Sequence, residues 1–250
     1  MLPILMYHGL HADEHDDGHF EPVYSVRPDA FAAQLDWLKR NGRRTILLEA
    51  LDQARDGDVV ITFDDGDVSN ARTALPLLAA RGMVAEFMVT SDFIGTPGWL
   101  AEADIATLLD AGMGVQAHGR THRFLEDLDE TSMRAELADS RSRLQALGAP
   151  ADAVALPGGR GGIRERDAAF AIGYRQVLTS IPGCNRRVDP GRLERIAVTR
   201  DLELDAFAAL VDWKGVAPRL RVLHHATLAL PKRVLGNARY AALRERLLRQ

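Results

Sequence analysis

Short apolar runs recur along the chain, and each is followed by a longer segment of mixed polarity. Residues 2–8 (LPILMYH) and 59–63 (VVITF) are two such runs, and β-branched side chains dominate the second. Continuous apolar runs of this length are typical of strands that are covered on both faces. We expect four further strands of this kind, at residues 83–89, 113–117, 153–156 and 174–179.

The segments between these runs carry the periodicity of amphipathic helices. One begins at Pro28, and its apolar residues keep helical spacing until Asn41 and Gly42, a pair typical of a helix C-terminus. Residues 11–27 show no periodicity and predict a long loop beside the end of the first strand, and loops of that length are often functional. The pattern becomes helical again after residue 200, and the other helices are predicted at residues 69–81, 101–111, 131–147 and 164–172.

This alternation predicts an α/β fold in which crossover helices join parallel strands. Six or seven such units in about 200 residues favour a barrel that is closed or nearly closed. The chain has 250 residues, of which 46% are hydrophobic and 26% charged, which is enough for one sizeable core. In such barrels the active residues lie at the C-terminal ends of the strands.

Candidate chemistry begins where the run 59–63 ends, at Asp64, Asp65 and Gly66. Neighbouring side chains on a strand point to opposite faces, so the two carboxylates are able to do different jobs within one site. A strand that ends in an acidic turn is the alternative interpretation, because Asp and Gly are common turn residues.

A second candidate segment, residues 114–122 (GVQAHGRTH), also passes from apolar to polar and carries His118 and His122. Two imidazoles and a carboxylate suit zinc or a similar divalent ion. Two unrelated histidines are the alternative, since this spacing often arises by chance. Gly119 directly after His118 favours an exit from a strand into a loop, from which both rings are able to reach one metal.

Together and in this order, the two motifs resemble those of the polysaccharide deacetylases of carbohydrate esterase family 4, also called the NodB homology domain. In that family a TFDDG segment supplies a catalytic base and a metal-ligating aspartate, and an H-[ST]-x-x-H segment supplies two metal-ligating histidines. The resemblance makes Asp64 the base and Asp65, His118 and His122 the ligands. Gly119 stands where the family usually has Ser or Thr, so a hydroxyl that helps to fix the metal loop is missing.

The resemblance implies the family's distorted barrel of about seven strands and one divalent metal ion. Zinc is the first expectation, and cobalt, nickel and iron are alternatives that the same donors accept. The implied reaction is hydrolysis of the N-acetyl group of an N-acetylhexosamine unit in a polysaccharide or its lipid-linked precursor. An O-acetyl ester or a small cyclic amide as substrate stays open, as does a non-catalytic module that binds metal and glycan.

A second resemblance concerns the proton donor to the leaving amine. Residues 5–8 (LMYH) look like the branch that makes surface and biofilm polysaccharides, in which a histidine on the first strand replaces the one near the C-terminus. We therefore expect His8 to be the general acid and Tyr7 to contact substrate. His224 and His225 superficially match the family's usual leucine-x-histidine motif, but they lie in a run with helical spacing.

Residues 155–160 (ALPGGR) look like the family's third motif, commonly R-x-P-x-G. Ala155 stands in place of the motif's arginine, which pairs with the base, so Arg160 and Arg195 are the candidates for that contact. Pro157 and Gly158 keep the motif's backbone role, and the N–H of Gly158 is the candidate donor to an oxyanion.

Trp99 lies between the two metal motifs. In the family an aromatic residue at this place borders the sugar site, and tryptophan stacks well on the apolar face of a pyranose ring. A residue that merely covers the barrel at a helix start is the alternative.

The charge balance changes sharply near the C-terminus. Residues 214–250 hold nine basic residues and one acidic residue, a net charge of +8, so residues 1–213 carry −12 because the whole chain is at −4. We divide the chain into a barrel domain, 1–213, and a basic helical extension, 214–250. The extension suits peripheral contact with an anionic membrane, with a solvated helix pair as the alternative. No aromatic interleaving accompanies the charge, so nucleic acid is not an expected partner.

The single cysteine, Cys184, has no partner for an internal disulfide, so folding does not require an oxidising compartment. The sequence shows no signal peptide and no apolar run of about 18 residues. We therefore expect a cytoplasmic protein, with membrane contact through the extension.

Overall fold

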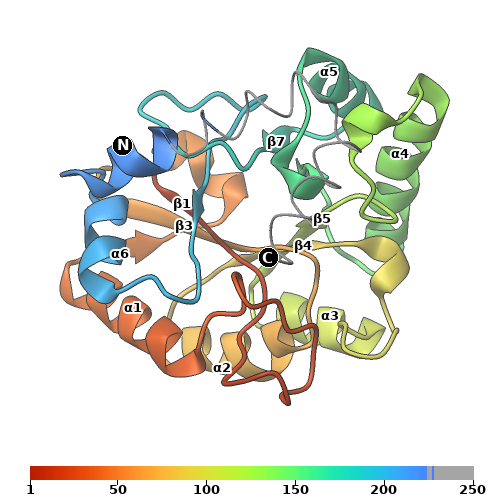
Figure 1. Ribbon diagram of the computed structural model, residues 1–250. Coiled ribbons are helices and arrows are strands. Elements are labelled where there is room, and N and C mark those ends of the chain that lie inside the picture. Colours follow the sequence, from red (N-terminus) through yellow and green to blue (C-terminus); the bar gives the residue numbers. More distant parts are fainter. Residues whose placement is uncertain (224–226, 228–250) are drawn as a thin grey trace, which may run out of the picture.

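The computed structural model describes residues 1–223 and 227. It shows a curled sheet of parallel strands with the helices arranged around it (Figure 1). This architecture confirms the predicted distorted (β/α) barrel of about seven strands.

Within the described residues, seven parallel strands follow one another in the order β7-β6-β5-β4-β3-β1-β8. The short strand β2 (Arg44–Thr45) pairs with β3 beside this path. Leu193, shortly before β8, forms a bridge to β7, so the segment that pairs with β1 also reaches the other edge of the sheet. The seven strands are β1 (Ile4–Tyr7), β3 (Asp58–Phe63), β4 (Glu86–Val89), β5 (Gly114–Ala117), β6 (Ala153–Ala155), β7 (Gln176–Leu178) and β8 (Ile196–Ala197).

Alternating side chains divide the strands between two apolar clusters. Tyr7 and Phe63 belong to the larger cluster, which also holds the apolar faces of the helices. Ile4 and Met88 belong to a smaller cluster that fills the barrel. Because direction alternates along a strand, Asp64 after Phe63 turns to the inner side, as does the residue after Tyr7.

A buried carboxylate lies inside the barrel at the opposite end of the strands, where β4 begins. Glu86 accepts hydrogen bonds from the N–H of Leu48 (2.7 Å) and from Nε2 of Gln116 (3.1 Å). Its complete burial raises the pKa of the carboxyl from 4.5 to about 7, against the effect of these two bonds.

Most helices lie within a few residues of their predicted bounds. One differs, because a π-helical turn at Asn70–Ala74 precedes α2 in the predicted helix 69–81. Pro76 has no N–H to donate to the carbonyl of Arg72, so an unbroken α-helical pattern is impossible there. The α-helices are α1 (Pro28–Arg40), α2 (Leu75–Ala79), α3 (Glu102–Asp110), α4 (Glu130–Ala146), α5 (Ile163–Ile172) and α6 (Leu204–Val211). Short 3-10 turns lie at Leu48–Gln53, Ser91–Phe93, Leu125–Asp127 and Pro157–Gly159.

The start of the basic extension is helical over residues 217–223. The rest of the predicted extension 214–250, including His224 and His225, lies outside the described residues apart from residue 227. The predicted domain boundary therefore stays a prediction. In the described part of the chain, no helix has both the length and the apolar character needed to cross a membrane.

Candidate active site

The predicted catalytic and metal-ligating residues meet at one end of the barrel. Asp64 and Asp65 follow β3, His118 follows β5 and His8 follows β1. The parallel register sets Tyr7 opposite Phe63, so His8 and Asp64 leave the sheet from adjacent strands at the same level. The C-terminal ends of parallel strands form one edge, which is where barrels of this kind carry their sites.

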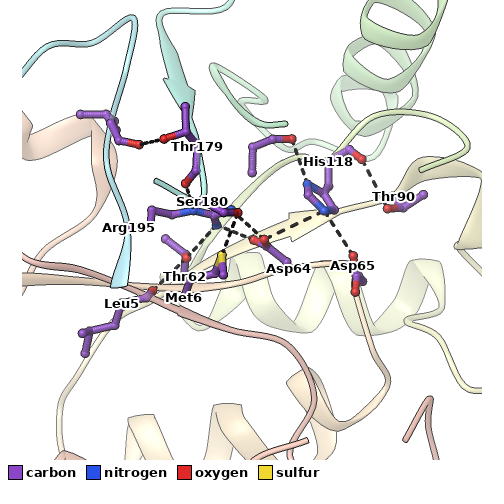
Figure 2. Close-up of polar contacts among 12 residues, drawn as sticks. Leu5, Met6, Thr62, Asp64, Asp65, Thr90, His118, Thr179, Ser180 and Arg195 are labelled. Carbon is purple, nitrogen blue, oxygen red and sulfur yellow. Dashed lines mark hydrogen bonds and ion pairs between the residues drawn. The ribbon is translucent and has the colours of Figure 1, made fainter. Parts of the chain in front are cut away.

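Asp65, His118 and His122 form a cluster whose ligand atoms all lie within 4.8 Å of one another. Nε2 of His118 is 3.2 Å from Oδ1 of Asp65 (Figure 2). Nε2 of His122 is also 3.2 Å from this oxygen. This oxygen is buried and has no hydrogen bond of good geometry among the described residues. Burial would raise the pKa of the Asp65 carboxyl, but the two imidazoles outweigh it and hold that pKa well below its usual value. Two imidazoles and a carboxylate that converge on one point fit a divalent ion.

The ligands are held in place by their backbones and neighbours. Nδ1 of His118 lies 2.9 Å from the carbonyl oxygen of Ala155, so Nδ1 carries the proton and Nε2 presents its lone pair to the cluster. Asp65 and His122 have positive φ angles of 73° and 62°, which are uncommon for residues other than glycine. Such conformations cost about 1–3 kcal/mol each and persist where the surroundings impose them, often at functional sites.

The loop that carries the two histidines is fixed by Glu136, a buried carboxylate on α4. Its Oε2 accepts from the N–H groups of Arg120 (3.0 Å) and Thr121 (2.8 Å). Its Oε1 accepts from the hydroxyl of Thr121 (2.6 Å). Three hydrogen bonds from the loop to this one side chain of α4 thus define the path of the loop.

Glu136 thus fixes the loop directly after Gly119, where the family usually has Ser or Thr. Sequence reasoning missed this residue, although a signal existed. Glu136 lies on the same face of its helix as Met133, Leu137 and Leu144, which are fully buried. A charged side chain on the buried face of a helix needs a partner, and here the partners are backbone N–H groups.

Asp64 is held by Arg195. Nη1 and Nη2 of Arg195 donate to Oδ1 and Oδ2 of Asp64 at 2.6 and 2.7 Å, a bidentate pair (Figure 2). The guanidinium also donates to the carbonyl oxygen of Thr179 (2.8 Å) and to Oγ1 of Thr62 (3.2 Å). Arg195 is 1% exposed and Asp64 2%, so the pair is shielded from water. Arg195 therefore makes the contact to Asp64, the predicted base, that Ala155 is unable to make.

The arginine determines the protonation of Asp64. Burial would raise the pKa of the Asp64 carboxyl, but Arg195 and, more weakly, His118 outweigh it and lower that pKa below its usual value. Arg160, the other candidate, instead lies over the ring of Phe124 at 4.1 Å, with Nη1 3.7 Å from Glu126. The prediction that Arg160 orients the base is wrong, because its side chain is engaged at this neighbouring ring.

His8 lies close to both carboxylates. When this ring is protonated, its charge contributes to the lowered pKa values of Asp64 and Asp65. The ring is half-buried, and the main-chain carbonyl of His8 accepts a hydrogen bond from Nδ2 of Asn70 (2.9 Å). His8 is thus in reach of the site that the two aspartates define.

The prediction that Tyr7 contacts substrate is wrong. Tyr7 is completely buried between the sheet and the helices, and its hydroxyl donates to Oε1 of Gln34 on α1 (2.8 Å). Its ring stacks on Phe63 and meets Phe31 edge-on. The physical reason is the alternation along β1, which sends Tyr7 outward because His8 turns inward.

Trp99 lies beside the metal cluster, in a row of rings. Its ring is 4.5 Å from that of Phe93, which in turn is 6.3 Å from the ring of His122. The ring of Trp99 also stacks on that of His19, with 5.4 Å between the ring centroids. The backbone of Trp99 bridges to Asp67, two residues after the paired aspartates. Trp99 therefore borders the site, but it packs against two other rings and is only partly exposed.

The third motif adjoins the metal loop. Pro157 is buried, and a Cβ added at Gly119 would lie 3.2 Å from its Cγ, so the two segments are in contact. Gly158 is exposed and has a φ of 62°. A Cβ at Gly158 would lie 2.5 Å from the ring of Phe124, so glycine is required here for steric and conformational reasons.

Comparison with known protein families agrees with these motifs. Residues 52–177 match the sequence model of a protein family that is described as polysaccharide deacetylase. The chain is 28% identical over 221 residues to YxkH of Bacillus subtilis (strain 168), a protein with a provisional polysaccharide deacetylase name. That match covers 84% of this chain and 76% of YxkH.

Solved structures share the architecture. BC0361, a polysaccharide deacetylase from Bacillus cereus, superposes with a TM-score of 0.76 at 25% identity, over 84% of this chain and 68% of BC0361. IcaB from Ammonifex degensii gives a TM-score of 0.73 at 22% identity, over 85% of this chain and 96% of IcaB. The likeness to IcaB concerns the fold.

Proposed function

This chain belongs to the polysaccharide deacetylase family, and from that premise we propose that it hydrolyses the N-acetyl group of N-acetylhexosamine units in a polysaccharide or its lipid-linked precursor. One observation carries the proposal: Asp64, held by Arg195, lies beside the convergent Asp65, His118 and His122. Amide hydrolysis needs a base for water, a stabilised oxyanion and an acid for the leaving amine. Candidates for all three roles lie at this end of the barrel.

We propose one divalent metal ion as cofactor, with Asp65, His118 and His122 as its protein ligands. This donor set accepts zinc, and also cobalt, nickel or iron according to availability. Such an ion supplies a Lewis acid that polarises the acetyl carbonyl and lowers the pKa of water. Glu136 and the carbonyl of Ala155 keep the ligands oriented from outside the cluster, and partners of this kind commonly matter to metal affinity.

In the proposed reaction Asp64 accepts the proton of the attacking water. Each carboxylate oxygen has two lone pairs, so Asp64 keeps acceptor capacity while it is paired with Arg195. Its Oδ2 is 4.0 Å from Nε2 of His118, so this oxygen lies toward the ligand cluster. The N–H of Gly158 is the proposed donor to the oxyanion. His8 gives a proton to the amine nitrogen as the carbon–nitrogen bond breaks.

Acetate release from a defined N-acetylglucosamine oligomer tests this function. We expect the purified protein to release acetate, a chelator to stop the release, and added zinc to restore it. Asp64→Asn is the matched control, because it keeps the shape of the side chain and removes the base. A protein that holds metal yet cleaves only O-acetyl esters or cyclic amides would transfer the proposal to those substrates. A protein with bound metal and no turnover would be a binding module.

We also propose that the extension 214–250 brings the protein to the anionic cytoplasmic face of a membrane. Val216, Leu220 and Leu223 recur at helical spacing and are 65%, 59% and 60% exposed, with the basic Arg219 exposed beside them. Mixed apolar and basic side chains suit the headgroup region. We expect sedimentation with phosphatidylserine vesicles at low salt that weakens at high salt and disappears on truncation after residue 213. No sedimentation at low salt would leave the extension as a structural cap.

A further inference from the structure

The ring of His8 has an aromatic neighbour that no motif of the sequence predicts. Tyr24, from the long loop 11–27, stacks on His8 with ring centroids 4.5 Å apart and an angle of 29° between the planes. The two rings come from different parts of the chain, the end of β1 and the loop that follows it. The loop therefore contributes directly to the surroundings of the proposed proton donor.

Among the described residues, none forms a hydrogen bond that holds the imidazole of His8. Nδ1 of His8 is buried and has no hydrogen-bond partner among the described residues. A histidine that transfers a proton normally needs a third group that fixes its ring, most often through a hydrogen bond to the second nitrogen. At His8 the restraining contact is instead made on the face of the ring, which Tyr24 covers.

The loop that carries Tyr24 is held at both ends by Arg200. Arg200 donates to the carbonyl oxygens of His11 (3.0 Å), Ala12 (2.6 Å) and Ser25 (2.7 Å), which ties both ends of the loop together. The hydroxyl of Ser25, the residue after Tyr24, lies 3.0 Å from Nδ1 of the buried His11. These bonds fix the backbone beside Tyr24, whose ring then stacks on His8.

We propose that Tyr24 is a positioning residue for His8, and that face-to-face contact with it sets the imidazole in the orientation needed to donate a proton to the leaving amine. The proposal rests on the proposed function of His8 as general acid. Aromatic stacking restrains the tilt of the ring and leaves both nitrogens free, and a tyrosine face also favours the cationic imidazolium. Misplacing a reacting group by about 1 Å commonly lowers the rate of the chemical step by about 100-fold.

The variants Tyr24→Leu and Tyr24→Phe test the role of the ring. We expect Tyr24→Leu to lower kcat for an N-acetylglucosamine oligomer by about 10-fold to 100-fold with little change in KM. Tyr24→Phe keeps the ring and should retain most of the activity. Both variants should bind the same amount of metal as the unchanged protein. Equal losses in the two variants would overturn the proposal, because stacking would then not be the property that matters.

A second substrate distinguishes positioning from general damage. The phenolate of 4-nitrophenyl acetate leaves without a proton, so its hydrolysis does not need the acid. We expect Tyr24→Leu to reduce amide hydrolysis and to leave ester hydrolysis nearly unchanged. Phe20→Leu is the matched control, because Phe20 belongs to the same loop but packs against His11 and Arg200. It should leave the ratio of the two rates unchanged.

The His8→Ala background completes the test. There Tyr24→Leu should change the amide rate by less than about 2-fold, since the residue that it positions is gone. An undiminished effect in this background would overturn the positioning role of Tyr24. By contrast, a His8→Ala protein with a normal amide rate would refute the acid role of His8 in the proposed function. The two failures are therefore distinguishable.

Discussion

Replacing Arg195 with methionine should destabilise the protein strongly, because Arg195 is the buried cation that pairs with Asp64. Methionine has a similar length but carries no charge and no hydrogen-bond donor. The buried Asp64 carboxylate therefore loses the hydrogen bonds from Nη1 and Nη2 of Arg195. Water is unable to replace them, because the two residues are 1% and 2% exposed. Removing one partner of a buried ion pair typically costs about 3–5 kcal/mol. We expect the free energy of unfolding to fall by that amount.

The pH dependence of this loss follows from the lowered pKa of Asp64. A lowered pKa in the folded state means that the stabilisation is present above the ordinary value of 3.8 and is lost as the pH falls through the lowered value. Without Arg195 the main group that lowers this pKa is gone, so the pKa of Asp64 rises relative to the unchanged protein. Protonation of Asp64 in acid then removes the unpaired buried charge. The difference in unfolding free energy between the two proteins should be largest near neutral pH and shrink in acid.

Urea unfolding of the metal-free proteins, followed by circular dichroism, measures the effect. Arg134→Met is the control, because the Arg134–Glu130 pair is about half exposed and should contribute less than about 1 kcal/mol. Adding Asp64→Asn to Arg195→Met removes the stranded charge and should recover part of the lost stability. An Arg195→Met protein as stable as the unchanged one would refute the reasoning. So would a further loss when Asp64→Asn is added.

Three further predictions concern metal binding and the interior of the barrel. Asp64→Asn should keep the metal and lose most turnover. Metal analysis should show reduced metal content in Asp65→Asn, His118→Ala and His122→Ala. An Asp64→Asn protein with near-normal rate would remove Asp64 from the base role. Glu136→Ala should weaken metal affinity by about 10-fold to 100-fold without touching a ligand, which a competition titration with a chromogenic chelator measures, and unchanged affinity would show that the loop holds itself. Because burial raises the pKa of Glu86 from 4.5 to about 7, its stabilising contribution is complete below pH 4.5 and is lost as the pH rises through about 7, a change of about 3 kcal/mol. The slope of unfolding free energy between pH 5 and pH 8 should therefore be smaller in Glu86→Gln, and equal slopes would contradict the raised pKa.

The order of elements and the location of the site were available from the sequence. Apolar runs report strands that are buried on both faces, and helical spacing reports the helices that cover them. The ends of β3 and β5 were also visible, because Gly66 and Gly119 follow the apolar runs in the sequence. In the structure both glycines have positive φ angles, 89° and 75°, which end a strand locally. Motifs at strand ends then had to share one edge, since all the strands are parallel.

Some of the sequence's information was present but not used. Alternation along β1 already implied that Tyr7 and His8 point to opposite faces, so an inward His8 excluded Tyr7 from the site. Glu136 was visible as a charged residue on the buried face of α4. Alternation along a strand and the polarity of a buried helix face are thus enough to exclude Tyr7 and to indicate a polar partner for Glu136.

The partners of the catalytic groups were decided only by the tertiary structure. Arg195 is 131 residues from Asp64 along the chain, and it reaches Asp64 because the segment before β8 joins both edges of the sheet. Arg160 lies in the segment of the third motif, far closer in sequence than Arg195, but it packs on Phe124. Tyr24 stacks on His8 from the loop 11–27, which has no periodicity of its own and whose two ends Arg200 holds together. Local patterns depend on backbone preference and on which face is buried, whereas these contacts depend on how segments distant in sequence pack together.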